Sequence, residues 1–267
     1  MAEDRVALVT GAARGIGAAT AAELARRGYR LALLDVNRKG LEQTAVAFAS
    51  AASPPLLFVG DLADLDFARS AVEQTAQAFG RLDLLVNNAA WREVQTMRET
   101  NVPTWDRTLR ICLTAPAFLA KWAAEVMERQ GAGVIVNVSS IRSHFNDGTA
   151  AAYIAAKGGL NALTYELAAL YGPRGIRVVA VNPGAIDTQL SGDLAEAGVM
   201  QAVVADCVDH TPLGRMGRPE EIARLIAWLA SGEASFISGT TITADGGLSH
   251  DHYGLALKRQ MKPGEFP

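Results

Sequence analysis

Short apolar runs alternate with longer amphipathic, alanine-rich stretches along most of the chain. Runs of four to eight apolar residues between turn residues are typical of buried strands, and longer runs with helical periodicity are typical of helices. We predict strands near residues 5–10, 30–35, 55–60, 82–87, 133–139, 176–181 and 240–243. We predict helices near residues 15–27, 38–51, 64–79, 102–130, 150–171 and 219–231. This alternation predicts an α/β fold, a Rossmann-type doubly wound parallel sheet of about seven strands with helices on both faces.

The chain is expected to form one domain, residues 1–267, because its length and its 49% apolar residues suit a single α/β unit with a large core. The stretch 189–218 is the least periodic and is rich in glycine. We interpret it as a mobile lid over the substrate. The C-terminal tail, 248–267, is expected to fray or to dock on a neighbour.

Polar residues and glycines follow the predicted strands. They are Gly11, Asp35, Asp61, Asn87, Ser140 and Asn182. Open parallel sheets bind ligands at the carboxyl ends of their strands. The functional site is therefore expected at this edge of the sheet.

A glycine-rich segment, Thr10–Gly17, lies between the first predicted strand and the first predicted helix. Glycines permit a tight turn and let a pyrophosphate approach the helix N-terminus, where free amides favour negative charge. The spacing is G-x3-G-x-G, which differs from the usual G-x-G-x-x-G. Such a segment alone is often only a turn, but the strand before it and the helix after it favour a nucleotide site.

Asp35 ends the second predicted strand. A carboxylate there can accept hydrogen bonds from a ribose diol and repels a 2′-phosphate, so it favours NAD over NADP. Arg14 favours the opposite choice, because it can pair with a phosphate, but it can also turn to solvent. We give Asp35 more weight than Arg14 and therefore expect NAD. The alternative role of Asp35 is that of a helix cap or turn residue.

The candidate chemistry lies in the segment 139–157. Tyr153 and Lys157 are four residues apart and so share one helix face, while Ser140 follows a buried strand. A neighbouring cation favours the phenolate, so Tyr153 can act as a general base, and a serine hydroxyl can hold a substrate oxygen. Taken singly, Tyr153 suits a half-buried packing residue, Lys157 a solvent-exposed lysine and Ser140 a helix cap. Together, and in register with the glycine segment, they favour catalysis.

Six motifs in register resemble those of the classical short-chain dehydrogenase/reductase family, from Arg5 to about Gly247. They are Thr10–Gly17, Asp61-Leu62, Asn87-Asn88-Ala89-Ala90, the Ser140, Tyr153 and Lys157 set, Asn182–Thr188 and Asp245-Gly246-Gly247. The resemblance implies reversible oxidation of a secondary alcohol to a ketone. It implies that Asp61 and Leu62 contact adenine, that Lys157 bonds the nicotinamide ribose, and that Asn182–Thr188 hold the carboxamide. The implied cofactor residues are Gly11, Arg14, Gly15, Ile16, Gly17, Asp35, Asp61, Leu62, Asn88, Ala89, Tyr153, Lys157, Pro183, Gly184, Ile186 and Thr188.

Ala90 stands where the family's Asn-Asn-Ala-Gly turn has glycine, and one further position departs clearly from the family pattern. The family usually has a catalytic asparagine seven residues after the tryptophan of a Trp-Asp pair, and here Trp105-Asp106 leads to Cys112. The family tetrad is thus reduced to a triad plus a cysteine, which affects the expected proton relay.

The residues that flank the site are polar, which predicts a small polar substrate such as a sugar, a polyol or a hydroxy acid. The candidates for substrate contact are Trp91, Arg92, Arg142, His144 and Asn146. Arg92 is the candidate for contacting a carboxylate or hydroxyls, and the alternative is that the two arginines face solvent or a subunit interface. Two other functions remain open. A 3-oxoacyl-acyl-carrier-protein reductase would prefer NADPH and need a basic docking patch, and Cys112 is the one support for a catalytically weak NAD-binding scaffold or sensor.

Charge and composition exclude several classes of function. The net charge is −3 without a basic block, which argues against nucleic acid as a partner. Cys112 and Cys207 are far apart and indicate neither a disulfide framework nor a metal site. The N-terminus lacks a signal-peptide pattern and no apolar run is long enough to span a bilayer, so a cytoplasmic location is expected. The family resemblance, with the apolar helices near 102–130 and 150–171, implies a homotetramer.

Overall fold

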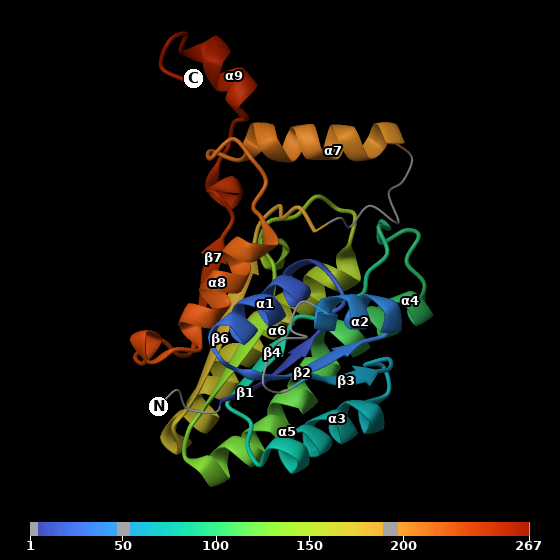
Figure 1. Cartoon of the computed structure of the whole chain (residues 1–267). Helices are drawn as coiled ribbons and strands as arrows, with labels where there is room; N and C mark the ends of the chain where they lie inside the picture. Colours follow the sequence, from blue (N-terminus) through green and yellow to red (C-terminus); the bar gives the residue numbers. More distant parts are fainter. Residues whose placement is uncertain (1–4, 47–53, 189–196, 267) are drawn as a thin grey trace.

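The computed structural model describes residues 5–46, 54–188 and 197–266 and contains one seven-stranded parallel sheet (Figure 1). The strand order is β3-β2-β1-β4-β5-β6-β7. The strands are β1 (Val6–Thr10), β2 (Arg30–Asp35), β3 (Leu56–Val59), β4 (Leu84–Asn87), β5 (Gly133–Val138), β6 (Ile176–Pro183) and β7 (Thr240–Ala244). The order runs outward in both directions from β1 and β4, so the doubly wound topology predicted from the sequence is confirmed.

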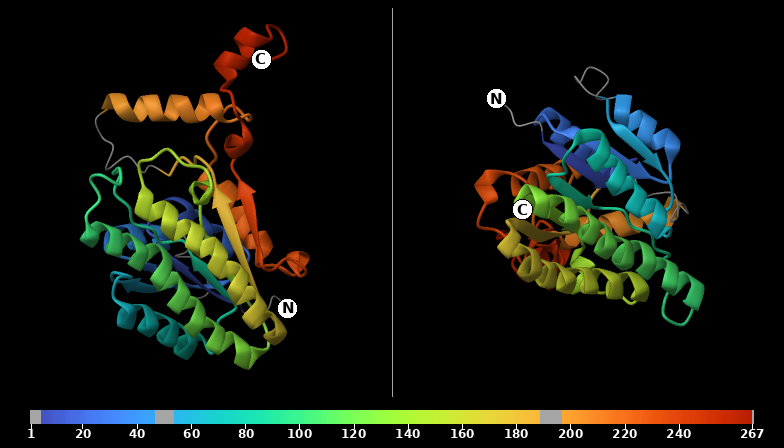
Figure 2. Two further views of the ribbon diagram at one scale, coloured as in Figure 1. Left: turned by 180° about the vertical axis from the view of Figure 1, so that it is seen from behind. Right: turned by 90° about the horizontal axis from the view of Figure 1, so that it is seen from below.

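Helices cover both faces of the sheet (Figures 1 and 2). They are α1 (Gly15–Arg26), α2 (Arg38–Val46), α3 (Leu65–Phe79), α4 (Val102–Leu109), α5 (Ala115–Gln130), α6 (Ala151–Tyr171) and α8 (Pro219–Leu229). Helices α1 and α8 pack together on one face, and α3 packs against α5 on the other, with α6 beside α5. Among these helices, none is both long enough and apolar enough to cross a membrane in the part of the chain that the structure describes.

The central strands contribute to two cores because successive side chains point to opposite faces of the sheet. In β1, Ala7 and Val9 belong to the core under α1 and α8, whereas Val6 and Leu8 belong to the core under α3 and α5. All four side chains have no exposed surface. Continuous burial of this kind explains why the strand sequence is apolar without alternation.

A chain of buried amides fixes α6 against the centre of the sheet. The Asn87 side chain donates to Asn137 Oδ1 at 2.9 Å, and the Asn137 amide donates to Thr164 Oγ1 at 2.9 Å. These residues lie on β4, β5 and α6, and all three are buried. Because buried polar groups need partners, this chain specifies one rotation of α6 relative to the strands.

Three regions differ from the sequence-based expectation. The aperiodic stretch 189–218 contains a helix, α7 (Ala197–His210), which we did not predict, and the tail contains α9 (Leu255–Met261). Residues 189–196, and residues 47–51 of the helix predicted over 38–51, lie outside the described residues. The helix predicted over 102–130 is present, but a π-helical turn (Arg110–Thr114) divides it into α4 and α5. Helix α7 lies beyond the carboxyl ends of the strands (Figure 1).

Candidate active site

The glycine segment forms a tight turn from β1 into α1 that excludes side chains. A Cβ atom on Gly17 would lie 2.0 Å from the Gly11 carbonyl oxygen, and one on Gly11 would lie 2.8 Å from Ala89 Cα. Gly11 also has a left-handed backbone, with φ of +64°. The turn therefore brings bare backbone to the N-terminus of α1, which suits the approach of a phosphate. Ile16 lies in the first turn of this helix and is partly buried.

A shared hydroxyl joins the glycine turn to the segment after β4. Thr10 Oγ1 accepts hydrogen bonds from the backbone amides of Asn88 and Ala89, both at 3.0 Å. In return, the Asn88 side chain donates to the carbonyl oxygens of Thr10 at 3.0 Å and Gly11 at 3.1 Å. The structure thus brings Gly11, Asn88 and Ala89 together where the strand order reverses.

Asp35 lies at the carboxyl end of β2, next to the glycine turn. One carboxylate oxygen accepts from the Ala13 amide at 3.1 Å and the other from the Asn37 amide at 3.0 Å. A carboxylate accepts several hydrogen bonds at once, so further acceptor positions remain for a ribose diol. Arg14, by contrast, is exposed at the start of α1.

Asp61 and Leu62 follow β3 at the same edge of the sheet. Asp61 accepts from the Ala63 amide at 2.9 Å and from the Arg107 guanidinium at 2.7 Å. Burial raises the pKa of Asp61, but these two hydrogen bonds outweigh burial and hold the pKa below its ordinary value. Leu62 is buried beside it.

The segment after β6 closes the opposite side of the glycine turn. Ile186 forms a bridge with Gly217, and Gly184 is so close to Asp245 that a Cβ atom would lie 2.6 Å from the Asp245 Cβ. Thr188 Oγ1 is buried and has no hydrogen-bond partner among the residues that the structure describes, and a Cβ atom on Gly15 would lie 3.1 Å from Thr188 Cβ. A buried hydroxyl without a partner, facing a glycine at a helix N-terminus, fits a bound pyrophosphate.

Lys157 is a buried cation next to Tyr153 on α6. Its side chain is 2% exposed, and Nζ donates to the Val138 carbonyl oxygen at 2.7 Å. Nζ lies 5.5 Å from the centre of the Tyr153 ring. Because an ammonium group has three donors, two remain for other partners. The Ser139 hydroxyl donates to the Lys157 carbonyl oxygen at 3.0 Å and so fastens this turn of α6 to the end of β5.

Ser140 follows β5 and caps a short 3₁₀ turn, Ile141–Ser143. Its Oγ accepts from the Arg142 amide at 3.1 Å. A hydroxyl has one donor and two acceptor positions, so the Ser140 O–H can still donate to a substrate oxygen. The sequence suggested a capping role for Ser140 as the alternative to a catalytic one. Ser140 does cap this turn, and the cap leaves its hydroxyl able to serve in catalysis.

Cys112 lies in the π-helical turn between α4 and α5 and is fully buried. Its thiol donates to the Trp91 carbonyl oxygen at 3.3 Å and accepts from the Trp91 amide at 3.4 Å. The Ala115 amide bonds to the Arg110 carbonyl oxygen, five residues back, as a π turn requires. Cys112 thus fastens the segment after β4 to the helix that packs beside α6.

The five candidate substrate residues divide into two groups. Trp91 packs with Cys112 and Tyr153, and the Arg92 guanidinium carbon lies 5.3 Å from the centre of the Tyr153 ring. The other three lie on the loop before α6. Arg142 pairs with Asp147, while His144 and Asn146 are exposed.

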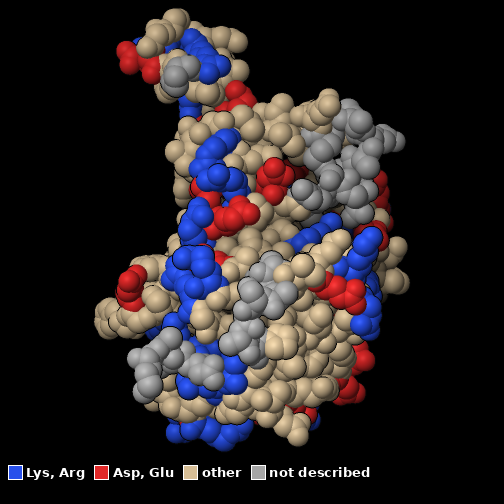
Figure 3. All heavy atoms as spheres, in the orientation of Figure 1, with Lys and Arg blue, Asp and Glu red and all other residues tan. Residues whose placement is uncertain are grey.

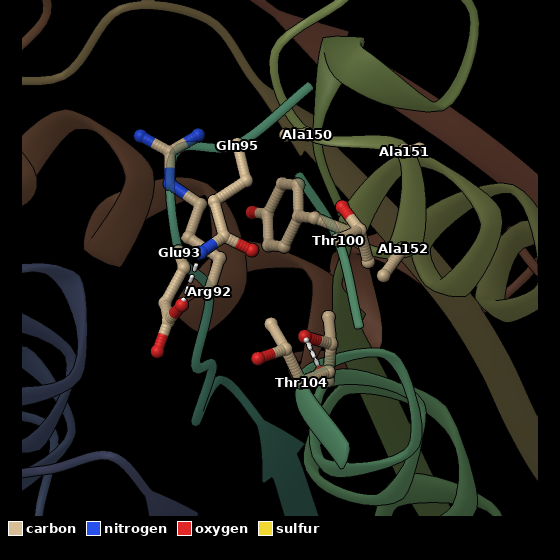
Figure 4. A pocket seen from close by; sticks show the side chains of 10 residues that line it. Arg92, Glu93, Gln95, Thr100, Thr104, Ala150, Ala151 and Ala152 are labelled. Carbon is tan, nitrogen blue, oxygen red and sulfur yellow. Dashed lines mark hydrogen bonds between the residues drawn. The ribbon is translucent and has the colours of Figure 1, made fainter. Parts of the chain in front are cut away.

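Several residues near Tyr153 were not identified from the sequence. Gln95, Thr100 and Thr104 line a small cavity together with Arg92 (Figure 4). The Gln95 amide donates to the Thr149 carbonyl oxygen at 2.9 Å, which joins the segment after β4 to the start of α6. These residues belong to no motif. The one feature of the sequence that could have identified them is that they lie between the motif at Asn87–Ala90 and Cys112.

Comparisons with known proteins agree with this geometry. A family model described as "Enoyl-(Acyl carrier protein) reductase" matches residues 11–249. The chain is 42% identical to a cis-4-hydroxycyclohexanecarboxylate dehydrogenase of Sinomonas cyclohexanicum over 247 residues. This alignment covers 92% of this chain and 97% of the relative. The chain is 35% identical to a D-threitol dehydrogenase of Mycolicibacterium smegmatis (strain ATCC 700084 / mc(2)155), covering 92% of this chain and 94% of the relative.

A solved structure shows the same arrangement of elements. The crystal structure of levodione reductase superposes with a TM-score of 0.87 at 33% sequence identity, covering 92% of this chain and 98% of that one. The family model matches residues 11–249, which contain the glycines of the turn, strands β2 to β7 and α6. The chain therefore belongs to the short-chain dehydrogenase/reductase family, as an oxidoreductase that uses NAD or NADP and acts on CH–OH groups.

Proposed function

We propose that this protein is an NAD-dependent oxidoreductase that interconverts a secondary alcohol and a ketone on a small polar substrate. The observation that carries the proposal is the buried Lys157 ammonium beside Tyr153, with Nζ 5.5 Å from the ring centre, at the strand ends that also hold the glycine turn. A buried cation next to a phenol has little structural value, whereas it suits proton transfer.

Each of the three side chains has one role in the reaction. Tyr153, as phenolate, accepts the hydroxyl proton of the alcohol, and Lys157 stabilises that phenolate by its charge. The Ser140 O–H donates to the substrate oxygen and orients it toward Tyr153. When bound, the nicotinamide supplies the hydride acceptor, or the hydride donor in the reverse direction. The reaction therefore needs no metal ion from the protein.

NAD is the proposed cofactor because of Asp35. Its carboxylate is held in place by the Ala13 and Asn37 amides, so it would be available to accept hydrogen bonds from the adenosine ribose of bound NAD. A 2′-phosphate next to this fixed negative charge is electrostatically unfavourable. Arg14 is exposed and offers no fixed compensating charge.

A small polar substrate is supported by the relatives and by the residues around Tyr153. The two relatives described above are named for a hydroxylated cyclohexane acid and for a four-carbon polyol. Arginine, glutamine and threonine side chains line the cavity beside Tyr153. We propose cyclic hydroxy acids and polyols as the first substrates to assay.

The alternative, an acyl-carrier-protein reductase, has support in the description of the family model. A protein partner of that kind is acidic and requires a basic surface. Figure 3 shows Lys and Arg gathered where α1 and α8 lie, but Arg26 and Arg27 pair with Glu23, and Arg215 pairs with Glu221. These pairs reduce the positive field of the surface, and we favour the small substrate.

The test is a Tyr153→Phe variant assayed for NAD reduction against a panel of cyclic alcohols, hydroxy acids and polyols. We expect turnover to fall by roughly 10³-fold or more, while NAD affinity measured by calorimetry stays within about threefold of wild type, because the phenol oxygen is lost and little else changes. Wild-type protein that reduces NAD with none of these alcohols but binds NAD would favour the alternative of a sensor or scaffold. Retained turnover in Tyr153→Phe would refute the mechanism.

A further inference from the structure

Arg92 is a half-buried cation beside the proposed general base, and it has no carboxylate partner among the residues that the structure describes. Its guanidinium carbon lies 5.3 Å from the centre of the Tyr153 ring. Two other arginines near the site are neutralised, Arg107 by Asp61 and Arg142 by Asp147. Arg92 therefore differs from them in leaving a positive charge uncompensated at the site.

The segment that carries Arg92 is fastened on both sides. Before it, the Trp91 backbone is held by the Cys112 thiol through both its amide and its carbonyl group. After it, the Gln95 amide donates to the Thr149 carbonyl oxygen at 2.9 Å. Glu93, the nearest acid in sequence, accepts instead from the Gln95 side chain at 2.8 Å (Figure 4). The backbone that carries Arg92 is thus fixed, and its guanidinium is not paired with the neighbouring carboxylate of Glu93.

A partly desolvated guanidinium favours an anionic partner more than a neutral one. It has lost part of its hydration, and its planar donors match the two oxygens of a carboxylate. Contact with an aromatic ring compensates for only part of the loss, because a ring face carries no full negative charge and so does not neutralise the cation. A neutral polyol would leave the charge uncompensated, whereas a carboxylate would neutralise it next to Tyr153.

We propose that Arg92 is the specificity-determining residue of this site and that it selects substrates that carry a carboxylate, so that the substrate is a hydroxy acid and not a neutral sugar or polyol. This step rests on the oxidoreductase function proposed above. Arg92 binds the carboxylate, Ser140 and Tyr153 bind the reacting hydroxyl, and the two contacts together orient the carbinol carbon. The reaction itself is unchanged.

The experiment compares two substrates of nearly equal shape, cis-4-hydroxycyclohexanecarboxylate and its neutral carboxamide, in wild type and in Arg92→Gln. We expect wild type to prefer the acid, and Arg92→Gln to lower kcat/KM for the acid by roughly 10- to 100-fold more than for the amide, mainly through KM. Arg92→Lys, which keeps the positive charge, should retain part of the preference for the acid over the carboxamide. Arg98→Gln is the matched control, since it removes the same charge from an exposed position of the same segment, and it should leave both substrates unaffected.

A binding measurement separates this inference from the proposed function. Calorimetry with cyclohexanecarboxylate and cyclohexanecarboxamide, on protein saturated with NADH, needs no turnover. We expect the carboxylate to bind more tightly than the amide in wild type and to lose this advantage in Arg92→Gln. Equal affinities in wild type, or an advantage that survives in Arg92→Gln, would overturn the role of Arg92 even if neutral alcohols are oxidised. Failure of every alcohol to reduce NAD, with the carboxylate advantage intact, would count against the proposed reaction alone.

Discussion

The Cys112 thiol serves both hydrogen-bonding groups of Trp91, at 3.3 Å to the carbonyl oxygen and 3.4 Å from the amide. Thiols are weak donors and acceptors, so the loss of both contacts in Cys112→Ala should cost about 0.5–1.5 kcal/mol. We predict that kcat of Cys112→Ala falls by less than roughly tenfold. Steady-state kinetics with the best substrate measures this directly.

Cys112→Asn is the informative companion variant. A side-chain amide has both a donor and an acceptor, so it can keep the two bonds to the Trp91 backbone and strengthen them. We predict activity at or above the wild-type level. Complete inactivation of Cys112→Ala, with fold and NAD affinity intact, would show instead that the thiol takes part in the chemistry.

The preference for NAD over NADP is expected to depend on Asp35. In Asp35→Ser the hydroxyl can still accept from a backbone amide, but the negative charge next to the ribose is gone. We predict that the ratio of kcat/KM for NADP to kcat/KM for NAD rises by roughly tenfold or more. Glu42→Gln, which removes one negative charge from the exposed side of α2, should leave the ratio unchanged. An unaltered ratio in Asp35→Ser would show that another residue sets the preference.

At the scale of elements, the N-terminus of α8 depends on one carboxylate. Glu221 accepts from both terminal nitrogens of Arg215, at 2.7 and 2.8 Å, and from the Arg218 amide at 2.8 Å. The Arg215 hydrogen bonds, followed by the Arg218 amide, lower the pKa of Glu221 to about 2 from 4.5. A folded-state pKa below the unfolded value stabilises the protein above pH 4.5, and this contribution is lost as pH falls toward about 2.

We therefore predict that Glu221→Gln lowers the free energy of unfolding by about 1 kcal/mol at neutral pH, as expected for loss of a charged cap. The difference from wild type should shrink as the pH falls below about 4.5. Urea unfolding at one protein concentration and several pH values measures it. Glu220→Gln removes a charge from the same turn at an exposed position and is the control. A difference that does not change with pH would show that the ionised cap is not responsible.

Sequence patterns predicted the elements with a strong local signal and missed those without one. All seven strands were predicted. Five of them, β1, β2, β4, β5 and β6, are apolar runs that are buried along most of their length, whereas the edge strands β3 and β7 are only partly buried. Helix α7 was missed because its apolar residues at helical spacing, Val199, Val203, Val204 and Val208, form only a short signal within the stretch 189–218, which its glycines make aperiodic as a whole. The π turn at Arg110–Thr114 leaves no pattern, because one additional residue in a helical turn does not change its composition.

The candidate site was predictable in part for a similar reason. Tyr153 and Lys157 lie one helical turn apart, and Ser140 follows a strand, so sequence spacing alone relates them. The contact between Cys112 and Trp91 joins residues 21 positions apart through tertiary packing. Arg142, expected at the substrate, is held by Asp147, an ion pair that no motif signals.

At the scale of the whole molecule, α5 and α6 present apolar side chains on the surface of the single chain. Phe118 is 40% exposed, Tyr165 is 47% exposed and Leu170 is 59% exposed. Phe118 also stacks against Trp122 at 5.7 Å between ring centres. Exposed groups of this size favour association, and related dehydrogenases commonly pair these two helices across a two-fold axis.

We predict a homotetramer of the 28.2 kDa chain. Light scattering after size exclusion at micromolar concentration measures the mass, and Tyr165→Asp should reduce it because a charge cannot be buried there without a partner. Glu166→Gln, at the next and also exposed position of α6, is the control. A monomeric mass for wild type would contradict the prediction.

The hydroxyl of Thr10 has a consequence for the order in which ligands enter and leave. It holds the Asn88 and Ala89 amides against the glycine turn, and the same segment continues to Trp91 and Arg92. Cofactor that orders the glycine turn therefore also orders one wall of the pocket, so we expect the dinucleotide to bind first and to leave last. By reciprocity, a substrate held at Arg92 should raise the affinity of the protein for the dinucleotide by the same factor.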